Sequence, residues 1–220
     1  PPGTLANNFW PAFGNTLFFT LVTVLLETIL GIGMALVMAK DFHGRGLLRA
    51  AVLVPWAIPT AITAKLWAFL FSEQGIVNSI FHAHVAWQTD PWAARFSIIL
   101  ADVWKTTPFM ALLILAGLQM IPKDLYEAAR MDGANAWQRF TRITLPLAKN
   151  SIIVAVLFRM LDALRMYDLP YIMVGPNPDS PTATLSQLVV AAIRQDHVNA
   201  ASALSTLIFL LIFLIALCFV

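Results

Sequence analysis

The sequence predicts an all-α protein, a polytopic bundle of transmembrane helices that forms a single domain over residues 1–220. Hydrophobic residues make up 59% of the chain and charged residues only 12%, whereas a soluble domain has about 25% charged residues. The apolar residues gather in runs of about 20, the length that a helix needs to cross a bilayer. Because a membrane core offers no water to bond backbone groups, we expect each run to be helical.

Five apolar runs qualify as spans, so we expect at least five transmembrane helices. In the first run, Asn15 or Thr16 can cap the start of the helix, and Gly31 and Gly33 are small enough to let another helix come close. The chain starts without methionine and ends inside an apolar run, so we expect the natural protein to continue beyond both ends. The expected spans are about 16–39, 47–71, 96–118, 150–174 and 200–220.

The connections between these spans differ in charge, and the difference orients the chain. Lysine and arginine gather in the cytoplasmic connections of membrane proteins. The 72–95 and 175–199 connections hold one such residue each, Arg95 and Arg194. We therefore expect the other two connections to face the cytoplasm, and their basic residues are Lys40, Arg45, Arg49, Lys123, Arg130, Arg139, Arg142 and Lys149.

Composition excludes several classes of function. The net charge of +2 is small and spread out, so we expect no nucleic-acid partner. The single cysteine, Cys218, excludes a disulfide framework, and no cysteine–histidine cluster has the spacing of metal ligands. All histidines lie in expected loops, so we predict no catalytic residue, no metal site and no enzymatic activity; they are His43, His82, His84 and His197.

A polar stretch in the 119–149 connection interrupts the apolar sequence. It runs from Tyr126 to Pro146 and reads YEAARMDGANAWQRFTRITLP. Its pattern predicts two short helices around a bend at Gly133, with Asp124 as a cap and Pro146 closing the second helix before the fourth span. One interpretation is an amphipathic helix that lies on membrane lipid headgroups. The small side chains around Gly133 instead favour the close approach of a protein partner.

The spacing within this stretch supports the second interpretation. Glu127, Ala128 and Ala129 are followed by Gly133 after three residues, then by Ile143, Leu145 and Pro146. This pattern resembles the EAA loop of the permease subunits of binding-protein-dependent ABC importers, most of all the maltose- and trehalose-type members of the carbohydrate branch. The resemblance covers nearly the whole chain and implies the fold of a type I ABC importer.

The resemblance also implies partners and a role for the stretch. In such importers the loop fits a cleft of a cytoplasmic ATPase, so the implied contact residues are Glu127, Ala128, Ala129, Asp132, Gly133 and Ala134. The implied complex holds a second permease subunit as a heterodimer, two ATPase subunits and an extracytoplasmic sugar-binding protein or lipoprotein, in the bacterial plasma membrane. ATP and Mg²⁺ belong to the ATPases, because this chain has no glycine-rich phosphate loop and no cofactor of its own.

Ionisable residues inside the expected spans are candidates for the substrate path, because charge is costly in a membrane. Arg159 lies about ten residues, or roughly 15 Å of helix, beyond Lys149, and Asp162 can pair with Arg159 or Arg165. A sugar site needs such charges together with aromatic rings. A structural ion network is the other interpretation, and it is favoured for Glu27. The candidates are Arg159, Asp162, Arg165, Tyr167, Asp102, Trp104, Lys105 and Glu27.

A permease subunit of an ATP-driven sugar importer, for a disaccharide such as trehalose or maltose, is thus the predicted function. The alternative is an ion-coupled secondary sugar transporter with Glu27, Asp102 or Asp162 as its proton site. The sequence shows no inverted repeat, and a secondary transporter would have no use for the EAA loop.

Overall fold

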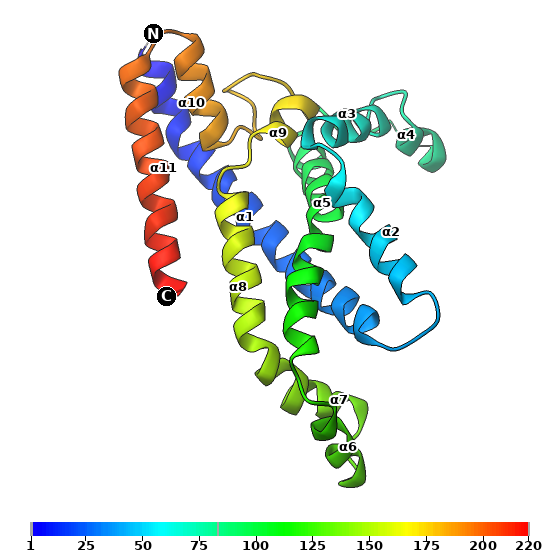
Figure 1. Ribbon diagram of the computed structural model, residues 1–220. Coiled ribbons are helices and arrows are strands. Elements are labelled where there is room, and N and C mark those ends of the chain that lie inside the picture. Colours follow the sequence, from blue (N-terminus) through cyan, green and yellow to red (C-terminus); the bar gives the residue numbers. More distant parts are fainter. Residues whose placement is uncertain (1, 83, 220) are drawn as a thin grey trace. The chain divides into compact units, whose positions relative to one another are not determined.

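A computed structural model of the protein describes residues 2–82 and 84–219, with side chains from Asn7 onward. The described residues are helical almost throughout, as predicted, and Figure 1 shows the helices in chain order. The helices are α1 (Pro2–Ala39), α2 (Arg45–Ala57), α3 (Thr60–Leu70), α4 (Ile76–Phe81), α5 (Pro91–Gln119), α6 (Lys123–Met131), α7 (Ala136–Arg139), α8 (Leu145–Ala163), α9 (Asp168–Met173), α10 (Leu185–Arg194) and α11 (Val198–Phe219), with a π-helical turn at Phe140–Thr144.

Four helical segments of the described chain are long and apolar enough to cross a membrane, and a fifth span exists if α2 and α3 count as one. The four are Asn7–Ala39, Pro91–Gln119, Ala136–Ala163 and Val198–Phe219. The last begins two residues before the expected span at 200–220, and α10 is a shorter apolar helix in the connection that precedes it.

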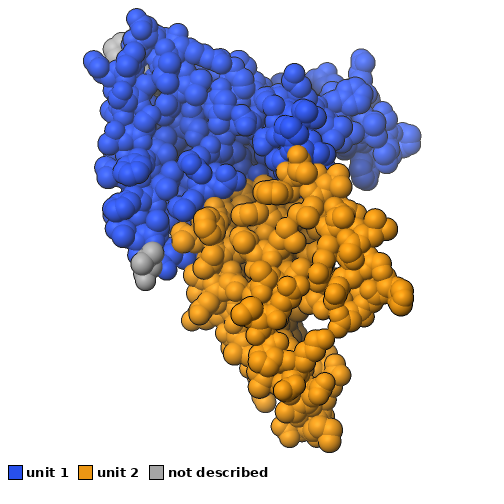
Figure 2. All heavy atoms as spheres, in the orientation of Figure 1, with its two compact units in different colours: residues 1–24, 58–105, 160–220 blue, residues 25–57, 106–159 orange. Residues whose placement is uncertain are grey.

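The chain divides into two compact units, which Figure 2 shows in different colours. Unit 1 comprises residues 1–24, 58–105 and 160–220, and unit 2 comprises residues 25–57 and 106–159. In unit 1, Phe19, Ala64, Ile98 and Leu169 bring α1, α3, α5 and α9 into one buried cluster. A second cluster packs α10 against α1 and α11 through Ala12, Leu185, Leu188, Ala192 and Ala201.

The core of unit 2 depends on small residues that let helices approach. A Cβ atom built on Gly31 would lie 3.1 Å from the Met110 Cβ, so α1 and α5 touch there. A Cβ on Gly117 would lie 2.1 Å from the Ser151 Oγ, which shows the same closeness between α5 and α8. Gly33 has nothing within 4 Å, so the prediction of a close approach holds for Gly31 and fails for Gly33.

The first helix begins well before the expected residue 16. Asn15 and Thr16 lie inside α1, and they bond a distant segment instead of capping the helix. The Asn15 Nδ2 donates to the carbonyl of Ala183 at 2.9 Å, and the Thr16 Oγ1 accepts the Leu185 amide at 3.0 Å. These side chains therefore anchor the start of α10 to α1 within unit 1.

Two expected spans are interrupted, and the first of these breaks is at a proline. The second, expected at 47–71, breaks at Ile58 and Pro59 between α2 and α3. The fourth, expected at 150–174, ends as α8 at Ala163 and resumes only as α9. In the gap between α8 and α9, the carbonyl of Met166 accepts the Thr184 hydroxyl at 2.8 Å.

Candidate functional site

The 119–149 connection bends where the sequence predicts. Helix α6 follows Pro122 and carries Asp124 in its first turn and Arg130 in its last, charges that complement the helix dipole. Asp124 thus lies inside the helix and is not its cap. Gly133 follows with a φ of +78°, a left-handed conformation that costs a residue with a Cβ about 1–2 kcal/mol. Its amide donates to the carbonyl of Arg130 at 3.0 Å, which closes the bend.

The second helix of the connection is short and runs on into α8. Asn135 and Gln138 form a capping box at the start of α7, with both bonds at 2.9 Å. The π-helical turn at Phe140–Thr144 then leads directly into α8. Pro146 does not close a helix as predicted, since it lies in the first turn of α8, which continues the helical segment that begins at Ala136.

Helices α6 and α7 and the bend between them form a hairpin, and its tip exposes apolar side chains. Met131 is 89% exposed and Trp137 is 70% exposed. The hairpin is held in place by a contact between α6 and the turn before α8, where the Tyr126 hydroxyl lies 2.9 Å from the Thr144 Oγ1. Figure 1 shows α6 and α7 beyond the start of α8. Of the implied contact residues, Glu127, Ala128, Asp132 and Gly133 are exposed, and Ala129 and Ala134 are half-buried.

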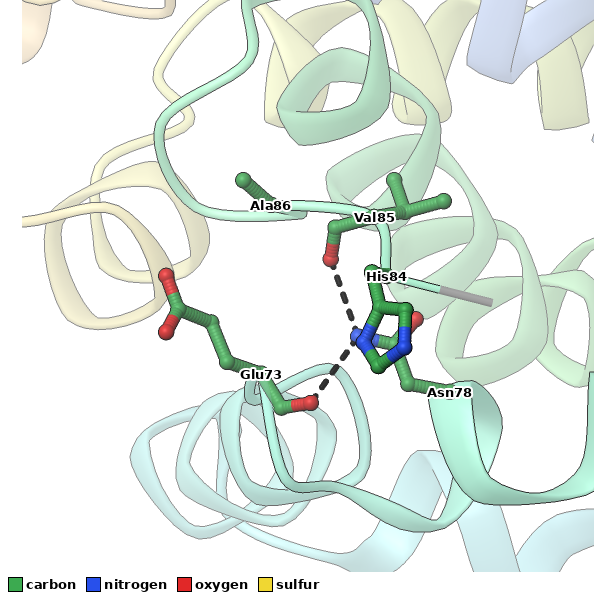
Figure 3. A pocket seen from close by; sticks show the side chains of 5 residues that line it. All are labelled: Glu73, Asn78, His84, Val85 and Ala86. Carbon is green, nitrogen blue, oxygen red and sulfur yellow. Dashed lines mark hydrogen bonds between the residues drawn. The ribbon is translucent and has the colours of Figure 1, made fainter. Parts of the chain in front are cut away.

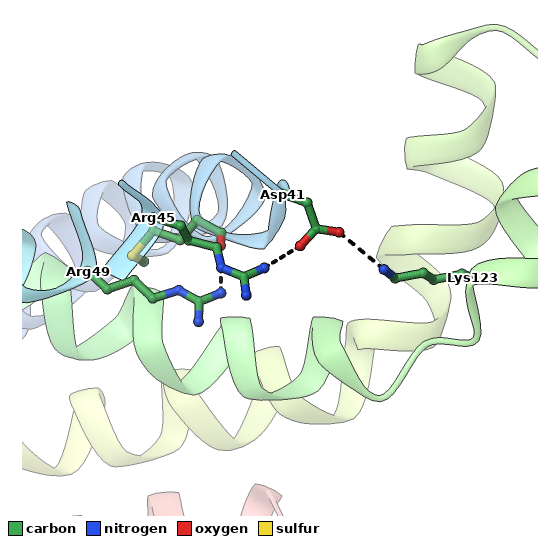
Figure 4. A network of polar contacts seen from close by, with 5 residues as sticks. Asp41, Arg45, Arg49 and Lys123 are labelled. Carbon is green, nitrogen blue, oxygen red and sulfur yellow. Dashed lines mark hydrogen bonds and ion pairs between the residues drawn. The ribbon is translucent and has the colours of Figure 1, made fainter. Parts of the chain in front are cut away.

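An ionic clasp joins the turn after α1 to the start of α6 within unit 2 (Figure 4). The Asp41 carboxylate bonds the Arg45 guanidinium with one oxygen and the Lys123 ammonium, at 3.1 Å, with the other. The Lys123 hydrogen bond and charge, followed by the Arg45 charge, hold the pKa of Asp41 below its ordinary value of 3.8. Arg49 donates to the Met38 carbonyl at 2.8 Å and so caps the end of α1. The two basic connections therefore meet on one side of unit 2.

A buried ion pair lies in the spans of unit 2. The Arg159 side chain is 2% exposed and Glu27 is 0% exposed. The Arg159 Nε and Nη2 donate to the two Glu27 carboxylate oxygens at 2.5 and 3.1 Å, and the Thr106 hydroxyl adds a bond to Glu27 at 2.6 Å. One carboxylate thus links α1, α5 and α8. Arg159 therefore has a partner that its own helix does not supply, and its pairing with Asp162 stays a prediction.

Lys105, a substrate-path candidate, bonds the backbone at the break between α2 and α3. Its side chain is 7% exposed, and its ammonium group donates to the carbonyl of Ile58. That carbonyl lies at the break before α3, where Pro59 interrupts the helical hydrogen bonds. A broken helix is tolerated at membrane depth when protein groups satisfy the freed backbone. Asp102 and Asp162 are the acids whose charges act on Lys105 within unit 1.

The remaining substrate-path candidates lie at the surface of unit 1. Trp104 is 37% exposed and packs edge-on against Trp67, with ring centroids 5.7 Å apart. Arg165 is exposed and donates to the carbonyl of Leu161 at 3.2 Å. Tyr167 stacks on Tyr171 at 4.9 Å between centroids. Aromatic rings, arginine and acids therefore occur together in unit 1, whereas Glu27 and Arg159 belong to unit 2.

Sequence reasoning missed three polar residues of these contacts. Asp41, Thr106 and Asn15 bond partners far away in the sequence, and no local spacing signals such partners. One signal was available for Lys105. A proline-broken span frees backbone carbonyls, and a lysine inside a neighbouring span is a donor that can bond one of them.

Known proteins resemble the chain over most of its length. Residues 27–220 match the family described as binding-protein-dependent transport system inner membrane component. The trehalose/maltose transport system permease protein MalF of Thermococcus litoralis is 46% identical over 94% of this chain and 72% of its own length. The trehalose transport system permease protein SugA of Mycobacterium tuberculosis is 39% identical over 96% and 69%. The sulfoquinovosyl glycerol transport system permease protein SmoG of Agrobacterium fabrum is 42% identical over 82% of this chain, which spans only 60% of that relative.

Solved structures agree with these relatives. A chain from the crystal structure of a bacterial ABC transporter involved in the import of the acidic polysaccharide alginate superposes with a TM-score of 0.86 and 27% identity, over 96% of this chain and 77% of that one. The methionine ABC transporter MetNI, at 19% identity and a TM-score of 0.68 over 98% of this chain and 92% of that one, shares the fold. The chain therefore belongs to the family of binding-protein-dependent transport system inner membrane components, the permease subunits of ABC importers.

Proposed function

We propose that this permease carries a sugar, of the disaccharide class that includes trehalose and maltose. The observation that supports this substrate class is the 46% identity with a trehalose/maltose permease. A trehalose permease and a sulfoquinovosyl glycerol permease are also close relatives. The ion-coupled alternative has no support, because the family to which the chain belongs is a binding-protein-dependent one.

The sugar path in this proposal runs along unit 1. Asp102, Asp162 and Arg165 offer charged groups that can bond sugar hydroxyls, and Trp104 and Tyr167 offer rings that can stack on the apolar face of a sugar. Glu27 and Arg159 lie in unit 2 with their charged groups bonded to each other, so we assign them to holding helices together.

The coupling step in this proposal is the docking of α6 and α7 on a cytoplasmic ATPase subunit. Exposed apolar side chains clustered among polar ones are typical of a protein contact, and Met131 and Trp137 supply them here. Glu127 adds an exposed carboxylate for a basic partner group. The basic residues of this connection favour its cytoplasmic placement.

A transport assay tests the substrate class. The complete importer is reconstituted in proteoliposomes and supplied with ATP and its binding protein, and the uptake of labelled trehalose, maltose, sucrose and methionine is compared. We expect ATP-dependent uptake of at least one disaccharide and none of methionine. Uptake that survives replacement of the ATPase by a hydrolysis-deficient variant, or that follows a proton gradient, would contradict the proposal.

A matched pair of tryptophan variants tests the docking surface. Trp137 and Trp92 are exposed to similar extents, 70% and 69%, but lie in different connections. We expect Trp137→Ala to lower the affinity for the ATPase subunits roughly tenfold or more, as for a truncated interface anchor, and Trp92→Ala to leave it unchanged. Co-purification of the ATPase with each membrane-inserted variant measures this. If the same amount of ATPase co-purifies with both variants, the hairpin tip does not contact the ATPase.

A further inference from the structure

A cavity of about 260 Å³ lies in the connection between α3 and α5, on unit 1. Figure 3 shows it between the turn that carries Glu73 and the segment that precedes α5. We call it the Glu73 cavity, and its lining residues are Glu73, Asn78, His84, Val85 and Ala86. The substrate path and the docking hairpin do not use these residues.

One buried amide holds the walls of the Glu73 cavity in place. Asn78 is 5% exposed, and its Nδ2 donates to the carbonyls of Glu73 and Val85, both at 3.0 Å. Its Oδ1 accepts the Trp87 indole N–H at 2.7 Å. Gly75 closes the turn below, because a Cβ there would lie 2.4 Å from the Leu70 carbonyl. The cavity is therefore built before any ligand arrives, which lowers the entropy cost of binding.

The side chains left available for a ligand are an acid and an imidazole. The Glu73 carboxylate and the His84 ring are exposed, and neither has a bond or ion pair with another described residue. A carboxylate carries a full negative charge at neutral pH, and the Asn78 amide is already used by its bonds to the walls. The Glu73 cavity therefore offers acceptors and one negative charge, which suits a cationic group that donates hydrogen bonds.

The surroundings do not neutralise this charge. The 72–95 and 175–199 connections hold four carboxylates against two arginines. Arg95 donates to the Asn15 side chain and to the Pro181 carbonyl at 2.8 Å, which also places these two connections together on one side of unit 1. Arg194 donates to the Tyr171 hydroxyl at 2.6 Å. Both arginines thus form hydrogen bonds with groups other than the Glu73 carboxylate.

We propose that the Glu73 cavity receives a lysine or arginine side chain of the extracytoplasmic binding protein. The inference rests on the proposed function, since it needs a binding protein that meets the side of the chain carrying the 72–95 connection. A metal ion fits the cavity less well: the described residues contain no group of three histidine, cysteine or acidic side chains that could hold one. A basic side chain needs only the carboxylate and the acceptors that are present.

Glu73→Gln removes the charge and keeps the cavity, because Asn78 bonds the Glu73 backbone carbonyl and not its carboxylate. Asp196→Asn is the matched control. It makes the same charge change on the same side of unit 1, at a φ of +60° that asparagine tolerates. Ala86→Phe, which fills the cavity without changing charge, is a second test variant.

The measurement is the apparent Kd of the sugar-loaded binding protein for the complete importer in nanodiscs, at low and high salt. We expect Glu73→Gln and Ala86→Phe to raise the Kd about tenfold or more, as for the loss of a charge partner that is desolvated in an interface. We expect Asp196→Asn to stay within about twofold of wild type, like a rim charge. The wild-type Kd should rise with salt more steeply than that of Glu73→Gln.

The outcomes separate the two proposals. A wild-type complex that binds and transports, together with a Glu73→Gln complex of unchanged Kd, overturns this inference and leaves the proposed function intact. A wild-type Kd that rises on treatment with EDTA, together with a Glu73→Gln Kd that does not, assigns the cavity to a metal ion and also overturns the inference. A wild-type complex that neither binds the protein nor takes up sugar overturns the proposed function and this inference with it.

Discussion

At the scale of single residues, the buried pair of Glu27 and Arg159 carries the largest energetic consequence. Moving either charge out of water is costly, and the cost is offset only when the partner is present in good geometry. Here the guanidinium fork meets both carboxylate oxygens, and Thr106 bonds the carboxylate as well. Removing one member leaves the other charge buried with its main partner lost, whereas removing both leaves no charge at all.

We expect Glu27→Met or Arg159→Met to destabilise the protein by about 3–5 kcal/mol, and the double variant to recover most of that loss. The thermal unfolding of the purified importer in detergent measures this. Glu73→Gln, which alters an exposed acid, serves as the control and should unfold like the wild type. If Glu27 instead contacted sugar, its variants would raise the KM for uptake while leaving the unfolding temperature unchanged.

The sequence predicted that charges in the spans would need partners, but it could not identify the partners. Asp162 was the local choice for Arg159 because helix neighbours lie three or four positions apart. The partner that the structure shows, Glu27, lies 132 residues away. Such pairs depend on which helix faces pack together, and spacing along one helix does not contain that information.

At the scale of helices, small residues decide where unit 2 packs. Gly31 and Gly33 look equivalent in the sequence, because both are glycines in one apolar run. Only Gly31 faces α5, where the Met110 Cβ and the Ala111 amide would lie 3.1 and 3.3 Å from an added Cβ. The two positions therefore form a natural test of helix contact.

We expect Gly31→Leu to destabilise the importer by roughly 1–3 kcal/mol through overpacking, and Gly33→Leu to be neutral or slightly stabilising because leucine favours helix by up to about 1 kcal/mol over glycine. Membrane insertion and thermal unfolding of each variant give the comparison. Equal unfolding temperatures for the two variants would show that α1 and α5 do not touch at Gly31.

Helix ends were less predictable than helix positions, and the reasons are particular. The break at Pro59 was foreseeable, since proline interrupts the ladder. The end of α8 at Ala163 was not foreseeable from the sequence, because mostly apolar residues continue to Val174. The break also depends on a distant segment, since the Thr184 hydroxyl bonds the Met166 carbonyl there. The early start of α1 was missed because residues 2–14 mix polar and apolar types, which weakens the hydropathy signal.

At the scale of the whole chain, the sequence predicts that the connections alternate between the two sides of the membrane. Two basic connections should share one side, and the Asp41–Lys123 contact joins them within unit 2. The 72–95 and 175–199 connections should share the other side, and Arg95 bonds Pro181 across them within unit 1. The cytoplasmic placement of the basic pair remains a prediction from charge.

The Asp41 clasp should respond to pH in a defined direction. Lys123 and Arg45 lower the pKa of Asp41 from 3.8. The stabilisation that the Asp41 carboxylate gives the folded protein is therefore complete above pH 3.8 and is lost as the pH falls through the lowered pKa. We expect the first turn of α6 to exchange amide hydrogens more slowly in the wild type than in Asp41→Asn at pH 7. The difference should shrink in high salt, since the clasp is exposed.

The comparison of the two proteins at each pH removes the intrinsic pH dependence of exchange. Their protection should become equal once the pH lies well below the lowered pKa of Asp41, where the wild-type carboxylate is protonated as well. A difference that persists at low pH would mean that the side-chain shape of Asp41, and not its charge, holds α6.

The π-helical turn at Phe140–Thr144 sets the rotation of α6 and α7, the hairpin that we propose docks on the ATPase, about the axis of α8. A π-helical turn accommodates one residue more than an α-helical turn, and one residue of α-helix corresponds to a rotation of about 100°. Deleting Thr141 would keep every proposed contact residue of α6 and α7. It would also rotate Trp137 about the axis of α8, so that its side chain points in a different direction. The direction in which the hairpin presents its side chains therefore depends on the π-helical turn. Deleting one residue there can change that direction while every side chain of α6 and α7 is kept.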